Sequence, residues 1–490
     1  MNLDLRMLRA RAWTRRQFLR TSHAGIGGLA LASLLARDGR AADKGKSASP
    51  DTPAAGRLPH FAAKAKHVIY LHMSGGPPQQ ELFDYKPELV KHHLQPCPDE
   101  LLKNQRFAFI KGHPLLLGTP YKFAQQGQCG AWVSELLPRV GGLVDDLAII
   151  RSMHTDQFNH APAELLMFTG TPRNGGAAMG SWITYGIGSD NDDLPGFVVL
   201  ISGGTDPTGG KALWSTGFLP TVYQGVQCRT TGDPILYVSN PKGMDREARR
   251  RSLDALRSLN EYEMKEVGDP ETLTRISQYE LAFRMQMSVP QVMDIKQEPG
   301  AILEQYGAKP GASSFANNCL LARRLVERGV RFVQLFDWGW DCHGTGKGDD
   351  IVYHLPEKCR EIDRPIAALV TDLKRRGLLD ETLVIWGGEF GRTSMNEARG
   401  GSKFLGRDHH PHCFTLWMAG GGIKGGVNLG ATDELGYSIT ESPMTVHDLQ
   451  ATILHQLGID AERFRFPYQG LQQRLIGVEG DGRVRKELLA

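Results

Sequence analysis

Long apolar runs, paired cysteine motifs and an excess of charge of one sign are all missing from this sequence. No apolar stretch approaches the about 20 residues of a membrane-spanning helix, so we expect no permanent membrane span. The seven cysteines are scattered without a Cys-x-x-Cys pair, which argues against a disulfide framework and against a zinc site built from thiolates. The net charge of +3 is close to balance and forms no basic stripe, so nucleic-acid binding is not expected.

The N-terminus has the order of a twin-arginine (Tat) export signal. Arg15 and Arg16 stand just ahead of a short apolar stretch, residues 24–35, that is softened by glycine and alanine. Small residues follow as far as Ala42, near which we expect cleavage. We therefore expect the protein to fold in a bacterial cytoplasm, to meet the Tat translocase, and to be exported folded, to the periplasm or beyond. A paired arginine ahead of an amphipathic helix in a cytosolic protein is the alternative.

Composition then divides the chain into segments. After the expected signal peptide (1–42), residues 43–66 are rich in Lys, Ser, Pro and Ala and are expected to form a flexible linker. A single folded domain is expected over residues 67–480, followed by a short tail (481–490). Within the domain, a less regular region at about 196–300 is interpreted as an insertion, and it is equally compatible with a functional lid and with a structural elaboration.

Short β-branched runs alternate with helical patterns along the domain. The runs at residues 67–73, 330–336 and 382–386 each end in a polar or glycine-rich loop, and helical patterns cover 316–327 and 362–376. This alternation predicts an α/β fold with a mainly parallel sheet and helices on both faces. In such sheets ligands bind at the carboxyl ends of the strands, which is where the polar loops lie.

The densest group of candidate metal ligands lies in residues 406–412. It contains Asp408, His409, His410 and His412. Imidazole and carboxylate together suit zinc, manganese or iron. Neighbouring residues cannot all reach one ion, so other loops must contribute if this is a metal site, and a histidine-rich surface loop is the alternative.

Other loops offer suitable residues at the expected sheet edge. Asp341 and His343 follow the second apolar run, and Glu389 follows the third. Carboxylates and histidines gathered at strand ends are typical of a two-metal hydrolytic site that activates a nucleophile and clamps a phosphoryl or sulfuryl group. Glu389 could instead form a buried salt bridge with Arg392 or another arginine that fixes the loop, and Arg392 could instead serve as an anion clamp.

Several sequence blocks carry a family resemblance. They are residues 74–87, 340–343, 387–393 and 406–411, and residues 430–437 fit as well. These blocks resemble the signatures of a Tat-exported, sulfatase-like bacterial family of unknown function (domain of unknown function 1501), which is similar in turn to the alkaline phosphatase and sulfatase superfamily. The resemblance covers essentially residues 67–480. It implies a three-layer α/β/α sandwich with a mostly parallel central sheet and one or two divalent metal ions (Zn, Mn, Fe or Ca) at its C-terminal edge.

The resemblance also implies particular metal ligands. The superfamily's ligands would fall on Glu81 or Asp84, on Glu389 and Phe390, and on His410 or His412. Phe390 cannot bind metal, so one ligand of the usual pair is either missing or supplied by a neighbour such as His409. Asp341, His343 and Asp408 remain candidates from the residues themselves.

The nucleophile position departs from the superfamily. The resemblance implies a nucleophilic Cys, Ser or Thr nine residues before a Thr-Gly pair. In this chain the pair is Thr169-Gly170, and the residue at that distance is His160. A histidine there is compatible with a metal ligand, a phosphoryl acceptor or a relic of lost hydrolysis. Thr155 and Ser152 are substitute hydroxyls nearby, and Asp156 is a substitute carboxylate. The sequence also lacks the Cys-x-Pro-x-Arg motif of formylglycine sulfatases.

Two functions remain open from the sequence. The first is an exported metal-dependent hydrolase of phosphate or sulfate esters, acting on a small-molecule or glycan ester, with Arg392 as anion partner. The second is a non-hydrolytic envelope protein that binds a sulfated or phosphorylated glycan or a protein partner. The missing nucleophile favours the second, whereas the cost of gathering ionisable groups favours the first.

Overall fold

The computed structural model describes residues 59–490 apart from 104–106, 231, 236–239, 242 and 268–270. The expected signal peptide and most of the expected linker lie outside the described residues. Within the described part of the chain, no helix is both long and apolar enough to cross a membrane.

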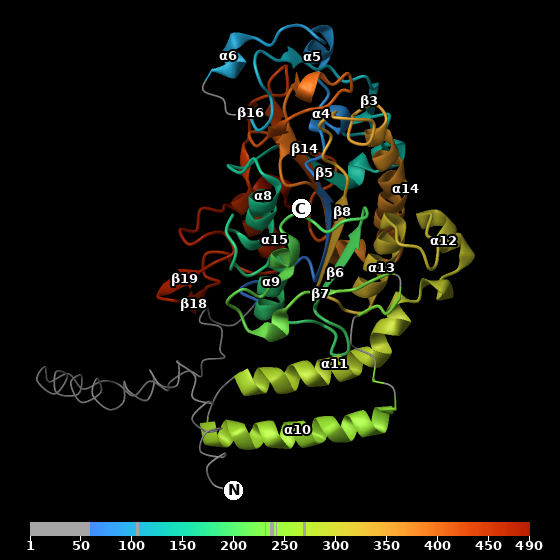
Figure 1. Cartoon of the computed structure of the whole chain (residues 1–490), viewed down its shortest axis with the longest axis vertical. Coiled ribbons are helices and arrows are strands. Elements are labelled where there is room, and N and C mark those ends of the chain that lie inside the picture. The colour runs from blue at the N-terminus through green and yellow to red at the C-terminus, as the bar shows by residue number, and fades with distance from the viewer. Residues whose placement is uncertain (1–58, 104–106, 231, 236–239, 242, 268–270) are drawn as a thin grey trace, which may run out of the picture. The chain divides into compact units, whose positions relative to one another are not determined.

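A nine-stranded, mostly parallel sheet lies at the centre of the fold (Figure 1). Its order is β14-β5-β13-β9-β1-β8-β6-β7, and β17 also pairs with β5. The strands are β1 (His67–Ser74), β5 (Leu147–His154), β6 (Phe197–Ser202), β7 (Val226–Gln227), β8 (Phe332–Trp338), β9 (Thr382–Gly387), β13 (Phe414–Ala419), β14 (Val427–Leu429) and β17 (Met444–Thr445). β13 runs antiparallel to β5 and β9, and the other pairings of this sheet are parallel. The three strands predicted from apolar runs are confirmed as β1, β8 and β9.

The side chains of β1 show why helices cover both faces of the sheet. Ile69, Leu71 and Met73 belong to one buried apolar cluster, whereas Val68 and Tyr70 belong to another. Successive side chains of a strand point to opposite faces, so a continuous apolar run requires cover on both sides.

Different helices provide that cover on the two faces (Figure 1). Side chains of α13 (Phe315–Glu327) and α14 (His354–Arg375) lie in the first cluster. Side chains of α8 (His160–Thr169), α9 (Met179–Ile187) and α15 (Val446–Gln456) lie in the second. The predicted α/β/α sandwich is therefore confirmed.

α14 begins earlier than the helical pattern predicted. It starts at His354, because Leu355, Cys359 and Ile362 continue its buried face at helical spacing toward the N-terminus. It ends just before Gly377, whose φ of 68° fits the glycine stop expected there.

The region expected as an insertion begins within the core, because β6 pairs with β8 in the central sheet. Farther on, two long helices, α10 (Arg246–Val267) and α11 (Glu271–Met293), lie side by side (Figure 1). The remaining short helices and strands are α4 (Gln79–Leu82), α5 (Pro87–Lys91), α6 (Asp99–Leu102), α7 (Pro138–Gly141), α12 (Gly300–Tyr306), β2 (Leu115–Leu116), β3 (Phe123–Gln126), β4 (Ala131–Ser134), β10 (Gly391–Arg392), β11 (Met395–Asn396), β12 (His409–His410), β15 (Ala431–Thr432), β16 (Ile439–Glu441), β18 (Phe466–Tyr468) and β19 (Leu471–Gln473).

A buried ion pair ties together the loops above the strand ends. Arg407 and Glu81 are fully buried, with Nε 2.9 Å from Oε2 and Nη2 2.5 Å from Oε1. Arg407 also donates to the carbonyls of Leu117 (2.8 Å) and Thr393 (3.1 Å). The guanidinium therefore joins α4 to the segments that contain Leu117, Thr393 and Arg407 itself.

We expect Glu81→Gln to lower the free energy of unfolding by about 3–5 kcal/mol, because it leaves the buried guanidinium without its counter-charge. Urea denaturation of the mature protein measures this value. Glu88→Gln is the matched control, since it breaks an exposed pair with Lys91 and should change stability little. Equal effects of the two substitutions would contradict this role for Glu81.

Candidate metal centre

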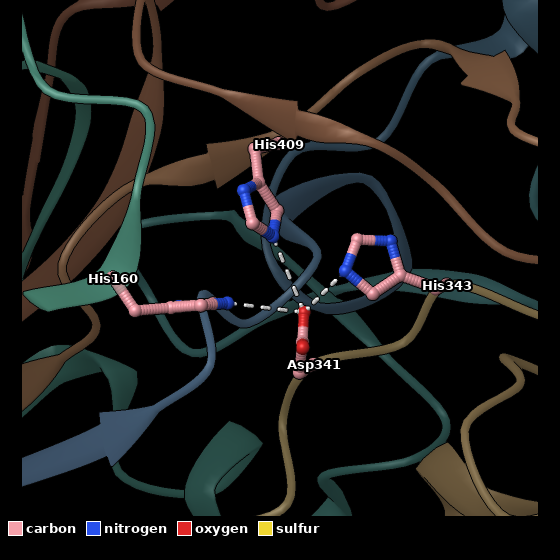
Figure 2. Close-up of side chains that lie close together, drawn as sticks. All are labelled: His160, Asp341, His343 and His409. Atoms are coloured by element: carbon pink, nitrogen blue, oxygen red, sulfur yellow. Dashed lines mark hydrogen bonds and ion pairs between the residues drawn. The ribbon is translucent and has the colours of Figure 1, made fainter. Parts of the chain in front are cut away.

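Four side chains from three separate segments converge at the carboxyl edge of the sheet (Figure 2). Asp341 and His343 lie in the loop after β8, His409 lies in β12, and His160 is the first residue of α8. Oδ1 of Asp341 is 2.8 Å from Nε2 of His343, 3.3 Å from Nε2 of His160 and 3.4 Å from Nε2 of His409. One ligand atom from each of the four residues lies within 4.8 Å of the others.

Parallel strands and small residues explain this convergence. β1 pairs in parallel with β8 and β9, so the loops that follow these three strands leave from one edge. A Cβ at Gly75 would stand 2.5 Å from the Asp341 nitrogen, and a Cβ at Gly406 would stand 2.0 Å from the His343 carbonyl carbon. Glycine at both positions therefore lets neighbouring loops press against the segment that carries Asp341 and His343.

The other ring nitrogen of each histidine is already bound. Nδ1 of His160 is 2.6 Å from Oε1 of Glu389, and Nδ1 of His409 is 2.7 Å from the carbonyl of Phe158. Nδ1 of His343 bonds to Oε2 of Glu397. Carbonyls and ionised carboxylates only accept, so each Nδ1 carries a proton, and a ring in its neutral form then presents the lone pair of Nε2 toward Asp341.

Positive charge holds the central carboxylate ionised. Burial alone would raise the pKa of Asp341, but the Arg392 guanidinium, which bonds to Oδ1, and the three histidines hold that pKa well below its usual range. One Arg392 N–H donor and three imidazole Nε2 atoms thus crowd a single oxygen. Nε2 of His160 is buried and has no hydrogen-bond partner within the described part of the chain.

Without a metal, this cluster can gain positive charge only when one of its histidines binds a second proton. Burial lowers the pKa of His160, but Asp341 and Glu389 outweigh it and raise the pKa to about 9. Burial lowers the pKa of His409 to about 4, and Arg392 and His160 add to that effect. The cluster therefore favours one added positive charge between its nitrogens and Asp341.

The donor set fits a divalent cation. Three imidazole nitrogens and one carboxylate oxygen suit zinc, manganese or iron. Ligands about 2.1 Å from one ion stand roughly 3.0–3.7 Å apart, and two of the three separations from Asp341 fall in this range while the third is slightly shorter. Acceptors that fix the distal nitrogen of each histidine are also usual around protein-bound metals.

Phe390, one of the positions where a ligand was expected, stands beside this cluster. Its ring centroid is 4.9 Å from that of His160 and 4.6 Å from that of His409. The preceding Glu389 contributes through His160, and no bond to Arg392 is seen. Phe390 therefore packs the two imidazoles, and His409 reaches the centre instead.

The structure does not bring either Glu81 or Asp84 to the centre. Glu81 is bound to Arg407, as described above. Asp84 accepts from the Thr432 hydroxyl at 2.5 Å and pairs with Lys86 at 3.1 Å. Both carboxylates instead hold neighbouring loops.

Two other candidates of the histidine-rich segment point elsewhere, whereas an oxygen of Asp408 lies within 4.8 Å of ligand atoms of His343 and Glu397. Nε2 of His410 lies 2.7 Å from the carbonyl of Tyr437, and the exposed residue His412 packs its ring against His410. Asp408 accepts from the backbone N–H groups of Phe109 (2.7 Å) and Ile110 (2.9 Å).

Arg392 and Thr155 are placed as supports. Arg392 is fully buried, and it donates to the carbonyls of Gly75, Gly76 and Arg407 as well as to Asp341. Its donors are thereby used within the protein, so it positions Asp341. Thr155 is buried after β5, where its hydroxyl accepts from the Gln157 N–H at 3.2 Å.

Two contributors were missed by the sequence reasoning. Glu397 is buried and orients His343, while it also bonds to Arg399. Phe109 covers His343 and His409, with ring centroids 5.0 Å and 5.6 Å away, and the Arg399 guanidinium stacks on Phe109 at 3.7 Å. Neither residue has a sequence signal, because both lie in irregular loops and belong to none of the motifs that predicted the site.

A cleft of about 660 Å³ opens beside the centre. Asp341 and His343 lie on its wall, together with Lys358, Arg399 and Glu361. The centre is therefore next to a space that can admit a small molecule or part of a larger chain.

Comparisons with known proteins gave a family match and distant structural similarities. A family model described as "Protein of unknown function (DUF1501)" matches residues 65–489. The PsFucS1 sulfatase from Pseudoalteromonas sp. is similar at 11% identity and a TM-score of 0.35, covering 86% of this chain and 73% of that chain. The lipoteichoic acid synthase LtaP from Listeria monocytogenes is similar at 12% identity and a TM-score of 0.34, with 88% and 78% coverage. The phosphonate monoester hydrolase SpPMH from Silicibacter pomeroyi is similar at 12% identity and a TM-score of 0.34, with 87% and 76% coverage. Similarity this distant carries no argument about activity.

We expect the purified mature protein to contain at least one equivalent of a transition metal, and Asp341→Asn to lose one equivalent, because it removes the anionic ligand. Inductively coupled plasma mass spectrometry measures the content. Asp84→Asn is the matched control and should keep the full amount, since Asp84 binds Thr432 and Lys86. Loss of metal in the control, or none in Asp341→Asn, would contradict the assignment of the centre.

Glu397→Gln should weaken metal binding by about 10–100-fold, because it removes the acceptor that orients His343. Titration of the metal-depleted protein with zinc by calorimetry tests this. Glu361→Gln, a change on the cleft wall away from the histidines, should leave the affinity unchanged. Equal affinities of wild type and Glu397→Gln would show that Glu397 does not support the centre.

Proposed function

The chain belongs to the DUF1501 family of proteins of unknown function, and we propose that it is an exported, metal-dependent hydrolase of phosphate or sulfate esters. The observation that carries the proposal is the convergence of three Nε2 atoms on Asp341 at the wall of an open cleft. A divalent cation held there supplies Lewis-acid stabilisation to the oxygens of a transferring phosphoryl or sulfuryl group. His160, His343, His409 and Asp341 would hold that ion.

His160 acts as a ligand in this proposal, and not as a phosphoryl acceptor. Its Nδ1 is bound to Glu389 and its Nε2 faces Asp341, so neither nitrogen is directed toward the cleft. The cysteines nearby are also poor nucleophiles, because burial raises the pKa of the thiols of Cys342 and Cys413. Attack on the ester by water in one step is therefore the route that these residues support.

The cations of the cleft have partners of their own. The Lys358 ammonium lies 2.8 Å from carboxylate oxygens of both Asp337 and Glu361, and Arg399 is bonded to Glu397. They moderate the negative charge that Asp341, Asp349 and Glu361 give to the wall.

Export through the Tat pathway suits this proposal. The paired Arg15 and Arg16 at the N-terminus support it. A protein that is exported folded can acquire its metal in the cytoplasm, before it reaches the periplasm.

A non-hydrolytic binding role is the second candidate. One specific observation favours it: Arg392, Arg399 and Lys358 are all engaged by protein acceptors, so none is an unpaired clamp for a transferred group. In that case the cleft would hold a sulfated or phosphorylated glycan, or a protein partner, without turnover.

Hydrolysis of generic esters separates the two roles. We expect the metal-loaded mature protein to hydrolyse p-nitrophenyl phosphate, bis(p-nitrophenyl) phosphate or p-nitrophenyl sulfate. The substitutions His160→Gln and Asp341→Asn should each lower kcat/KM by at least about 10²-fold, because both remove metal ligands. Asp84→Asn should retain activity. A metal-loaded protein that cleaves none of these esters, yet binds sulfated or phosphorylated glycans in calorimetry, would favour the binding role.

A further inference from the structure

A second group of ionisable side chains adjoins the centre. The two are linked by Glu389, which belongs to this group and also bonds to His160 of the centre. His72 lies on β1, Glu164 on α8, and Glu389 follows β9. All three side chains are fully buried. Nε2 of His72 is 3.3 Å from Oε2 of Glu389 and 3.7 Å from Oε1 of Glu164, and the three atoms lie within 4.8 Å of one another.

The atoms that face one another in this group make no hydrogen bonds. Nε2 of His72, Oε1 of Glu164 and Oε2 of Glu389 lack hydrogen-bond partners within the described part of the chain. Buried polar atoms are normally satisfied, so three in one place indicate something that the protein atoms alone do not supply.

The opposite oxygens of the two carboxylates are firmly held. Oε2 of Glu164 accepts from the Thr208 hydroxyl at 2.8 Å and from the Gly209 N–H at 2.7 Å. Oε1 of Glu389 likewise accepts from the Gly75 N–H at 2.9 Å and lies 2.6 Å from Nδ1 of His160. Each carboxylate is thus anchored by one oxygen and aims the other toward His72.

The spacing suits a cation better than direct hydrogen bonds. Hydrogen bonds to a ring nitrogen are about 2.7–3.2 Å long, which is shorter than both contacts of His72. Ligands about 2.1 Å from one ion stand roughly 3.0–3.7 Å apart, which matches both.

Charge leads to the same conclusion. Two buried carboxylates with a single imidazole between them are costly without further positive charge. A metal at the first centre requires a neutral His160, so that histidine then brings no positive charge to Glu389. The rings of Phe168 and Phe336 lie 5.0 Å and 5.5 Å from the His72 ring in edge-on contact, so no charged side chain enters from those sides.

We propose that His72, Glu164 and Glu389 bind a second divalent transition-metal ion, enclosed in the protein. One imidazole and two carboxylates suit zinc or manganese, and water can complete the coordination. The ion holds Glu389, which in turn orients His160. It is a positioning site, because none of its ligands reaches the cleft. The charge argument rests on a metal at the first centre, but the proposal does not depend on ester hydrolysis.

Metal content of three variants tests this proposal. Wild-type mature protein should contain two equivalents by inductively coupled plasma mass spectrometry. Glu164→Gln should contain one, because it removes a ligand of the second ion alone, and Asp341→Asn should also contain one. Asp363→Asn is the control for loss of a buried carboxylate that binds backbone N–H groups, and it should keep two. Circular dichroism verifies that each variant is folded.

Wild-type protein alone provides an independent measurement, should Glu164→Gln not fold. A chelator should remove the two ions in separate phases, because the Asp341 side chain is 26% exposed whereas the ligands of the second ion are 0% exposed. One equivalent in wild type, release in a single phase, or two equivalents in folded Glu164→Gln would overturn the second site. Two equivalents without any ester hydrolysis would overturn only the proposed function.

Discussion

The crowding of three imidazole nitrogens around one carboxylate oxygen is the constraint on which the rest of this structure depends. Each histidine has its other nitrogen occupied by a fixed acceptor, so its lone pair is directed at Asp341. Nitrogen lone pairs that face a carboxylate are repelled by its negative charge unless a positive charge stands between them. All three Nε2 atoms face Asp341 instead of bonding to other protein groups. A bound cation is the simplest explanation of this geometry.

Buried arginines make such an arrangement mechanically possible. Arg392 fixes Asp341 against the loop after β1, and Arg407 fixes α4 against the loop that leads to His409. These guanidinium groups donate hydrogen bonds to carbonyls and carboxylates of the protein itself, and so they stiffen the loops above the strand ends. Loops supported in this way can hold ligands at the precision that a metal requires. For the same reason Arg392 and Arg399, which lie beside the centre, are both bonded to carboxylates of the protein.

Much of the fold could be predicted from the sequence, because apolar runs and helical periodicity are local signals. β1, β8 and β9 were found in this way, and parallel strands then bring Asp341, His343 and Glu389 to one edge. The choice between His409 and His410 could not be made, because neighbouring residues of β12 point to opposite sides and the pattern does not reveal the phase. Glu81 and Asp84 came from a resemblance alone, and they carry no local signal that separates a ligand from an ion pair. His72 and Glu164 were not singled out, since a histidine within an apolar strand and a glutamate within a helix are ordinary until tertiary structure brings them together.

Anomalous diffraction from crystals of the mature protein tests the central claim most directly. Data collected above the absorption edge of the metal identified in solution should give a difference peak between Oδ1 of Asp341 and Nε2 of His160, His343 and His409. A well-ordered centre without a peak, in which a protonated His160 bonds directly to Asp341, would contradict the account and leave these residues as a buried ion-pair network.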